Sequence, residues 1–313
     1  MSEIVPPGLR DPRISTQMVS AHRREFEVDM CGEGDRLALC LHGFPEHSFS
    51  WRHQLPMLAE LGYKAWAPNM RGYGRSSKPK RVEDYVLEEL MADVAGLIDA
   101  AGCRSVTLIA HDWGAVIAWY FAMRQQRPLE KLIILNVPHP GPAAKVLRSS
   151  LKQLLKSWYI FFFQIPKLPE WLLGLRHARR VGEAIRNSAC NKDQFPDEVI
   201  GVYRRNASQR RALRGMINYY RGLVLGGSAK RQAELGFPVI ETPTLMIWGE
   251  DDLALTKETT YGTDKFVSDL TIRYLPRVSH WVQQDAPEEV NAMIKAFLEG
   301  ERVPEMRWKA VLE

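Results

Sequence analysis

The chain has 313 residues, of which 45% are hydrophobic and 25% are charged, so it is long enough to bury a core and is not a disordered protein. Its net charge of +5 is too small to indicate nucleic acid as a partner, and we expect none. The charge is unevenly spread, because residues 145–231 carry 18 Lys and Arg against 5 Asp and Glu, a net of +13, and the rest carries a net of −8. This asymmetry predicts two layers with different roles.

The sequence shows no sign of export or of a membrane anchor. The four cysteines are too few for a disulfide scaffold, and their spacing matches no zinc site. Residues 1–13 contain no apolar signal core. Polar residues and prolines interrupt the apolar stretch 158–175, which argues against stable membrane insertion. We therefore expect a cytoplasmic protein, and the oligomeric state is left open, with a homodimer as one alternative.

Apolar runs of strand length alternate with helical patterns at both ends of the chain. The predicted strands lie at 36–41, 64–68, 105–110, 131–136, 244–248 and 271–275. The predicted helices of these two regions lie at 51–61, 84–101, 115–126 and 287–298. Strands that are apolar on both faces and separated by helices are typical of an α/β fold with a mostly parallel sheet flanked by helices.

The middle of the chain breaks this rhythm. Residues from about 140 to 235 contain no convincing buried strand. Pro169 and Pro196 mark helix starts, and 209–225 is a further helix with an apolar stripe. We therefore predict an α/β core of residues 1–139 and 236–313, interrupted by an all-helical cap, or lid, of residues 140–235.

The strand at 105–110 continues through Ala110-His-Asp-Trp-Gly114 into a helix. Small residues two positions before and after Asp112 give the pattern of a nucleophile elbow, although a plain helix N-cap is the simpler interpretation. Three other loop segments favour the nucleophile. They are His42-Gly-Phe-Pro-Glu46, where an oxyanion hole is expected, Trp248-Gly-Glu-Asp-Asp252 and Ser279-His-Trp281. Their chain order of nucleophile, acid and histidine is that of α/β-hydrolases.

From about residue 25 to 300, the chain resembles the soluble epoxide hydrolase branch of the α/β-hydrolase superfamily. The resemblance rests on His42–Glu46, His111-Asp-Trp-Gly114, Ser279–Trp281 and the segment Asn69-Met-Arg-Gly-Tyr-Gly-Arg-Ser76. It implies a lid inserted after the sixth strand and the conversion of epoxides to vicinal diols. No metal constellation is visible among the scattered histidines, and this chemistry requires no cofactor.

A carboxylate is anionic at neutral pH and can attack a saturated carbon directly, so Asp112 would form an alkyl ester with the substrate. The absence of a Gly-x-Ser-x-Gly motif disfavours a serine esterase. His280 would activate the water that hydrolyses the ester. From the residues alone, Asp251 and Asp252 both qualify as the acid that orients His280, and the resemblance places the acid at Asp252. The oxyanion would be held by the backbone N–H groups of Phe44 and Trp113.

The resemblance also implies two lid tyrosines that protonate the opening epoxide oxygen. Within 209–225, Tyr220 lies in the apolar stripe, whereas Tyr219 is rotated by about 100°. Tyr159 matches the family's first lid tyrosine, and Tyr203 is the reserve. For each of them, the alternative is a core tyrosine with a satisfied hydroxyl.

The lid is rich in apolar side chains, which predict an apolar tunnel and lipophilic epoxides as substrates, with water as the second reactant. We expect Trp158, Phe162 and Trp281 to contact the substrate. The other apolar residues of the lid are Phe161, Phe163, Ile165, Trp171 and Leu172. The sequence does not identify the particular epoxide.

Two alternative functions use the same scaffold. A haloalkane dehalogenase shares the Asp elbow, but its typical Asn after His-Gly is replaced here by Phe44, which has no side-chain donor. The arginines typical of a fluoroacetate dehalogenase are replaced by residues 113–116. A non-catalytic binding protein of this fold usually lacks a triad member, whereas all candidates are present here.

The basic lid has two interpretations. We expect it to dock on the acidic core by complementary charge. The alternative is that its exposed face attracts an anionic membrane surface or the carboxylate of a fatty-acid epoxide.

Overall fold

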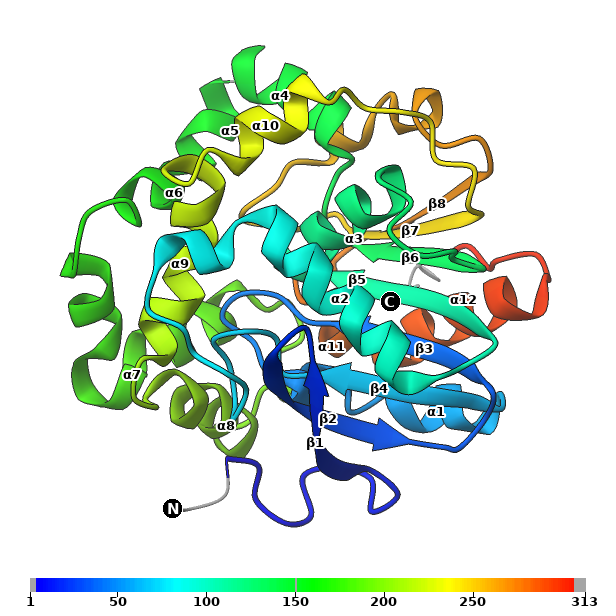
Figure 1. Cartoon of the computed structure of the whole chain (residues 1–313), viewed down its shortest axis with the longest axis horizontal. Helices are drawn as coiled ribbons and strands as arrows, with labels where there is room; N and C mark the ends of the chain where they lie inside the picture. The colour runs from blue at the N-terminus through cyan, green and yellow to red at the C-terminus, as the bar shows by residue number, and fades with distance from the viewer. Residues whose placement is uncertain (1–3, 150, 307–313) are drawn as a thin grey trace, which may run out of the picture.

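An eight-stranded sheet runs through the centre of the computed structural model, which describes residues 4–149 and 151–306 (Figure 1). The strands are β1 (Ser15–Ala21), β2 (Arg24–Cys31), β3 (Arg36–Leu41), β4 (Tyr63–Pro68), β5 (Ser105–His111), β6 (Lys131–Leu135), β7 (Thr244–Gly249) and β8 (Leu270–Leu275). Their order is β1-β2-β4-β3-β5-β6-β7-β8; β1 and β2 pair antiparallel, as do β2 and β4, and every later pair is parallel. The predicted α/β fold with a mostly parallel sheet is confirmed.

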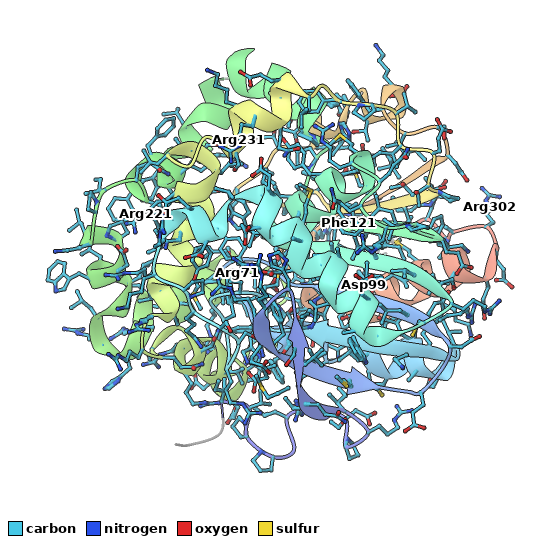
Figure 2. The ribbon with its side chains drawn as sticks, viewed as in Figure 1. Arg71, Asp99, Phe121, Arg221, Arg231 and Arg302 are labelled. Carbon is cyan, nitrogen blue, oxygen red and sulfur yellow. The ribbon has the colours of Figure 1, made fainter. Side chains whose placement is uncertain are left out.

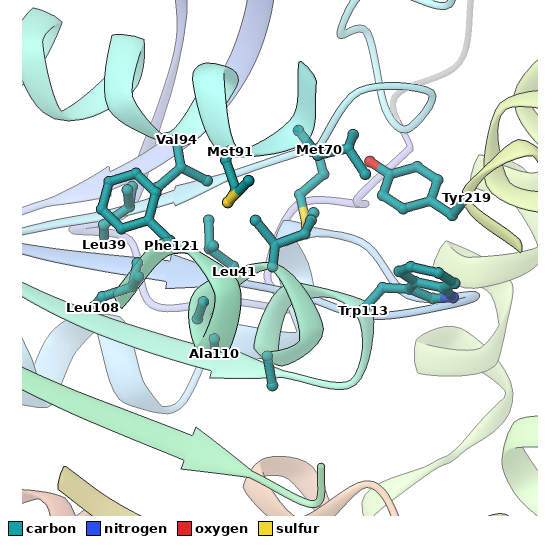
Figure 3. Packing of buried hydrophobic residues seen from close by; sticks show 14 of the residues in the cluster. Leu39, Leu41, Met70, Met91, Val94, Leu108, Ala110, Trp113, Phe121 and Tyr219 are labelled. Carbon is teal, nitrogen blue, oxygen red and sulfur yellow. The ribbon is translucent and has the colours of Figure 1, made fainter. Parts of the chain in front are cut away.

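Helices cover both faces of the sheet. Helices α2 (Leu87–Ala101) and α3 (Trp113–Met123) pack on one face, and α1 (Gln54–Glu60) and α12 (Pro287–Glu299) pack on the other. Because successive side chains of a strand point to opposite faces, Leu39 of β3 joins the first cluster and Cys40 joins the second. Figure 3 shows Met91 of α2 and Phe121 of α3 directed toward Leu39. This double coverage explains why the strands are apolar throughout.

Shorter elements complete the core. They are the 3₁₀ helices η1 (Ser48–Trp51), η2 (Val82–Tyr85), η4 (Lys257–Thr260) and η5 (Thr263–Lys265), and the helix α11 (Val282–Asp285). The helix predicted over 51–61 is thus split between η1 and α1.

The N-terminal hairpin of β1 and β2 is not anticipated from the sequence. Strand β1 lies at the edge of the sheet, pairs with β2 and keeps most of its side chains partly or fully exposed. Such an edge strand lacks the buried apolar run that identifies the central strands. The hairpin joins the sheet because β2 pairs with β4 from Val28 to Cys31.

Helices follow β6 at the place where the sequence predicts an insertion. We call residues 140–235 the cap segment. Its helices are α4 (Pro140–Ser149), α5 (Leu151–Lys156), α6 (Trp158–Phe162), α7 (Leu168–Ser188), η3 (Lys192–Gln194), α8 (Asp197–Ala207), α9 (Ala212–Val224) and α10 (Ser228–Glu234). No described residue of the cap segment belongs to a strand. None of the helices in residues 4–149 and 151–306 has the length and apolarity needed to cross a membrane.

Hydrogen bonds, several of them between uncharged groups, hold the cap segment on the core. The Tyr219 hydroxyl of α9 donates to the Arg71 carbonyl oxygen at 2.8 Å. Asn206 of α8 bridges two core loops, because its Oδ1 accepts the Gly74 N–H at 2.9 Å and its Nδ2 donates to the Glu46 carbonyl oxygen at 2.7 Å. These contacts anchor the cap segment to two of the segments that carry the family resemblance.

Direct ion pairs contribute little to this docking. In the described part of the chain, Arg231 and Glu88, with nitrogen and oxygen 3.0 Å apart, form the only ion pair between the cap segment and the core (Figure 2 labels Arg231). The backbones approach closely instead, because a Cβ placed on Gly215 of α9 would lie only 2.7 Å from the Gly72 Cα. Direct ion pairs between the cap segment and the core therefore give little support to the expectation of docking by complementary charge.

Candidate active site

Asp112 stands at the sharp turn from β5 into α3. Its backbone has φ 45° and ψ −120°, a conformation that non-glycine residues rarely adopt and that costs of the order of 1–3 kcal/mol. Two glycines leave the space that this turn needs. A Cβ on Gly114 would collide with the Leu41 carbonyl, and a Cβ on Gly43 would collide with the Asp112 side chain. The small residues of the motif therefore have a steric reason.

The Asp112 carboxylate is mostly buried, and each of its two oxygens lies near a different polar group. Its Oδ1 accepts the Phe44 backbone N–H at 2.6 Å, and its Oδ2 lies 3.5 Å from the His280 Nε2. The side chain is 19% exposed. Burial raises the pKa of Asp112, but the hydrogen bond and charge of His280, together with the Phe44 N–H, outweigh burial and bring this pKa below its usual value. Asp112 is therefore anionic at neutral pH.

A second carboxylate, that of Asp252, binds the ring nitrogen of His280 that faces away from Asp112. The His280 Nδ1 donates to the Asp252 Oδ2 at 2.6 Å, and the Asn136 Nδ2 donates to the same oxygen at 2.9 Å. The Asp252 Oδ1 accepts the backbone N–H groups of Ala254 and Leu255 at 2.7 and 2.9 Å. Burial raises the pKa of Asp252, but the charge of His280 and these donors bring it below the usual value.

The structure shows which of the two neighbouring aspartates, Asp251 or Asp252, lies next to His280. Asp251 is exposed, and its Oδ2 lies 4.0 Å from the Cys190 Sγ, whereas Asp252 is buried against His280. Of the two neighbours, Asp252 is thus the one placed to orient His280.

His280 lies between two negative charges. Burial lowers its pKa, but the charges and hydrogen bonds of Asp252 and Asp112 together raise this pKa well above the usual value. With Asp112 ionised, His280 is therefore protonated at neutral pH.

Tyr220 and Tyr159 reach the site from the cap segment. The Tyr220 ring packs edge-on against Trp113 and Phe44, with centroids 4.9 and 5.3 Å apart, and Tyr159 lies 5.8 Å from Tyr220. Burial, and next the Asp112 charge, raise the pKa of both hydroxyls, so they stay protonated and able to donate. Among the described residues, the Tyr159 hydroxyl has no hydrogen-bond partner in the protein.

The other two candidate tyrosines have structural partners. The Tyr219 hydroxyl is bound to the Arg71 carbonyl, and the Tyr203 hydroxyl donates to the Gln284 Oε1 at 2.5 Å. The rotation that the helical pattern predicts between Tyr219 and Tyr220 is thus present, and Tyr203 is not available as a reserve.

The Phe44 N–H and the start of α3 form a pair of backbone donors. Trp113 is the first residue of α3, so its N–H lies outside the hydrogen-bond ladder of that helix. Together with the Phe44 N–H on the Asp112 Oδ1, this arrangement fits the predicted oxyanion hole.

The three residues expected to contact the substrate lie in different surroundings. Trp281 is buried, lies 5.1 Å from the His280 ring and donates its indole N–H to the Ser188 Oγ at 2.8 Å. Phe162 is half-buried. Trp158, in contrast, is 62% exposed on the outer side of α6, because the face of this short helix that carries Tyr159 is the one turned inward. Contact of Trp158 with the substrate stays a prediction, although the exposed position of its ring does not favour it.

A buried pair beneath the site was missed from the sequence. The Glu46 Oε2 accepts the Gly43 N–H at 2.8 Å and lies 2.8 Å from the His111 Nδ1, and the His111 Nε2 lies 2.8 Å from the His280 carbonyl oxygen. Glu46 and His111 stand inside the recognised motifs, but their contact joins three loops that are far apart in sequence. Among the described residues, no group of three or more His, Cys, Asp or Glu is arranged to hold a metal ion.

Comparison with known proteins agrees with this geometry. The model of the alpha/beta hydrolase fold family matches residues 39–287, so the chain belongs to the α/β-hydrolases. Within them it belongs with the epoxide hydrolases. It is 34% identical to mouse epoxide hydrolase 4 over 305 residues, which cover 95% of this chain and 83% of that protein.

Two further similarities support this placement. The chain is 38% identical to Caenorhabditis elegans epoxide hydrolase 1 over 85% of its own length, but it spans only 66% of that relative. A crystal structure of a Bacillus megaterium epoxide hydrolase with an inhibitor superimposes with a TM-score of 0.82 at 29% identity, covering 90% of this chain and all of that one.

The position of Asp252 generates a pKa prediction with a matched control. Asp252→Asn removes a charge that raises the pKa of His280, so we expect this pKa to fall toward or below the ordinary value. Asp251→Asn, one residue away but exposed, should leave it unchanged. An NMR titration of the His280 ring in both variants measures the effect, and equal titration in the two would contradict the assignment of Asp252.

Proposed function

We propose that this protein hydrolyses lipophilic epoxides to vicinal diols through a covalent ester on Asp112. The observation that carries the proposal is the opposite engagement of the two carboxylate oxygens, with Oδ1 on the Phe44 N–H and Oδ2 facing His280. The epoxide hydrolases among the relatives support the substrate class. The reaction adds one water to one epoxide and requires no other reactant.

In the first step, the Asp112 Oδ2 attacks a ring carbon of the epoxide. The new carbon–oxygen bond forms as the ring carbon–oxygen bond breaks, and the released oxygen takes a proton from Tyr159 or Tyr220. Both hydroxyls remain protonated at neutral pH, and both lie on the cap side of the carboxylate. The products of this step are a hydroxyalkyl ester and a tyrosinate.

In the second step, water attacks the carbonyl carbon of the ester. Loss of the Asp112 charge lets the His280 imidazolium give up its proton, which neutralises the tyrosinate, and the neutral ring then takes a proton from the water. The oxyanion forms on Oδ1, where the Phe44 N–H already lies and the Trp113 N–H is available. Collapse of the intermediate releases the second diol oxygen with a proton from His280. The remaining proton returns to His280 as Asp112 returns to its anionic form, which restores the resting state.

The charge of Asp112 coordinates these two steps. While Asp112 is anionic, it contributes to the raised pKa of His280. Ester formation removes that charge, so the pKa of His280 falls and the imidazole becomes a better base at the moment when water must be activated. Asp252 keeps the ring oriented throughout.

The division of the chain follows from these roles. We propose that residues 140–235 act as a cap that supplies the two tyrosines, over a core of residues 1–139 and 236–313 that supplies the nucleophile, base and acid. We also propose a cytoplasmic location, which is supported by the state of the four cysteines, all of them free thiols.

The proposed role of Tyr159 and Tyr220 as proton donors can be tested with Tyr219, the neighbour of Tyr220 in α9, as a control. Tyr220→Phe and Tyr159→Phe each remove a donor to the opening oxygen, so ester formation should slow by roughly 10²- to 10³-fold. Tyr219→Phe removes a neighbouring hydroxyl that binds Arg71, so it should alter stability by about 1 kcal/mol and leave the chemical step unchanged. Rapid-quench measurement of the first turnover separates these cases. Wild-type ester formation in both single variants and in their double would rule out the tyrosines.

The two steps can be separated by removing the base. In this mechanism, His280→Gln still permits attack by Asp112 but not hydrolysis of the ester. The variant should consume about one equivalent of epoxide, gain the mass of one substrate and carry it on Asp112 in peptide maps. Asp112→Ala should form no adduct. An inactive but folded His280→Gln that never forms a covalent species with a good substrate would overturn the covalent mechanism.

A further inference from the structure

Large apolar side chains gather on the outer surface of the cap segment. Of the fourteen exposed ones in the described residues, seven lie between positions 155 and 175. Six of them follow each other at spacings of three or four residues, and we call these six the apolar ridge. They are Trp158 (62% exposed), Phe161 (64%), Ile165 (43%), Leu168 (39%), Trp171 (61%) and Leu175 (36%). Scattered exposed apolar residues are ordinary, but their concentration in one short stretch of the chain is typical of an interaction surface.

Arg221 holds the two halves of the ridge together. Its guanidinium donates to the carbonyl oxygens of Phe163 and Ile165, both at 2.9 Å, and pairs with the Glu170 carboxylate at 2.6 Å. The end of α6 and the first turns of α7 are thereby tied to one side chain. In Figure 1, α7 lies outside α9, on the side away from the sheet. Figure 2 labels Arg221, which belongs to α9 and is buried beneath the ridge segment.

A basic cavity of about 520 Å³ opens beside the ridge, between α7, α8 and α9. Its lining includes Glu170, Gly174, Arg176 and His177 of α7 and Lys167 just before that helix. Four cations, Lys167, Arg176, Arg211 and Arg214, surround it, and in the described part of the chain none of them pairs with a carboxylate. The one carboxylate of the lining, Glu170, is already held by Arg221.

The wall of this cavity includes a strained turn. Arg176, His177 and Ala178 have φ values of 53°, 55° and 52°, a left-handed conformation that consecutive non-glycine residues rarely adopt. Arg204 holds the turn by donating to the carbonyl oxygens of Arg176 and His177, both at 3.2 Å. Such strain persists where the surroundings enforce it, and it concentrates at binding sites. Here it places two basic side chains at the rim of the cavity.

We propose that the apolar ridge and the basic cavity together bind the surface of an anionic phospholipid bilayer. The ridge, with two tryptophans and a phenylalanine, has the composition that enters the headgroup region of a membrane without crossing it. The cavity takes a lipid phosphate, because arginine guanidinium groups match phosphate oxygens in a bidentate manner. This role uses the positive charge of the cap segment that docking on the core leaves unpaired.

The ridge lies close to the proposed catalytic tyrosines, so membrane binding would bring the site near substrate dissolved in the bilayer. Helix α6 carries Trp158 and Phe161 on its exposed side and Tyr159 on the side that packs against Tyr220. A lipophilic substrate dissolved in the bilayer would therefore meet the protein one helix away from the proposed catalytic tyrosine.

Sedimentation of the full chain with lipid vesicles tests the proposal. We expect binding to phosphatidylcholine vesicles that contain phosphatidylglycerol, weaker binding to phosphatidylcholine alone, and loss of binding at high salt. Reversing Arg211 and Arg214 to Glu should weaken binding by roughly fivefold or more for each charge. Trp171→Ser should weaken it roughly tenfold.

Two control variants match these changes elsewhere on the surface. Arg302→Glu reverses an exposed charge at the opposite edge of the molecule in Figure 2, and Tyr261→Ser removes an aromatic ring that is 58% exposed. Both should bind vesicles like wild type. Asp112→Ala should also bind normally, so that failure of the membrane proposal and failure of the catalytic one are distinguishable.

Three outcomes would overturn the proposal. The first is the absence of sedimentation with anionic vesicles at low salt. The second is equal vesicle binding by the ridge or cavity variants and by their controls. The third is a dimer in solution that Trp171→Ser converts to a monomer without lipid binding, which would show that a second copy of the chain covers the ridge.

Discussion

A carboxylate that stays ionised although it is mostly buried is the constraint on which this site depends. Burial alone would protonate Asp112 and end its reactivity as a nucleophile. The Phe44 N–H and His280 offset that effect from two sides. These groups follow β3 and β8, whereas Asp112 follows β5, and the parallel sheet brings the ends of these strands to one edge. The sheet order and the glycine contacts at the turn are therefore requirements of the site.

The same negative charge acts on the neighbouring titratable groups. It helps to raise the pKa of Tyr159 and Tyr220, which keeps them protonated as acids, and it helps to raise the pKa of His280. When the ester forms and the charge disappears, His280 is released to act as a base. In the proposed mechanism, the charge of the nucleophile thus sets the order of the two steps.

The parts of this account that could be predicted from the sequence are those encoded by local patterns. Asp112 and His280 each follow an apolar strand within a short motif, so topology and chain order point to them. Asp251 and Asp252 follow the same strand, and only the family resemblance distinguishes them before the structure is known. The Glu46–His111 contact could not be predicted, because it joins loops distant in sequence. The orientation of Trp158 depends on how one short helix is rotated against α9, and the β1–β2 hairpin lacks a buried run. Docking of the cap rests on backbone proximity at Gly72 and Gly215, which net charge does not reveal.

The central claim is that an oxygen of Asp112, and not an oxygen of water, enters the substrate first. A single turnover in water enriched in oxygen-18, with enzyme in excess over epoxide, tests it most directly. The account predicts a first diol that contains no label and an Asp112 peptide that has gained one labelled oxygen from hydrolysis of the ester. A labelled diol in that first turnover, with Asp112 unlabelled, would contradict the account and indicate direct attack by water.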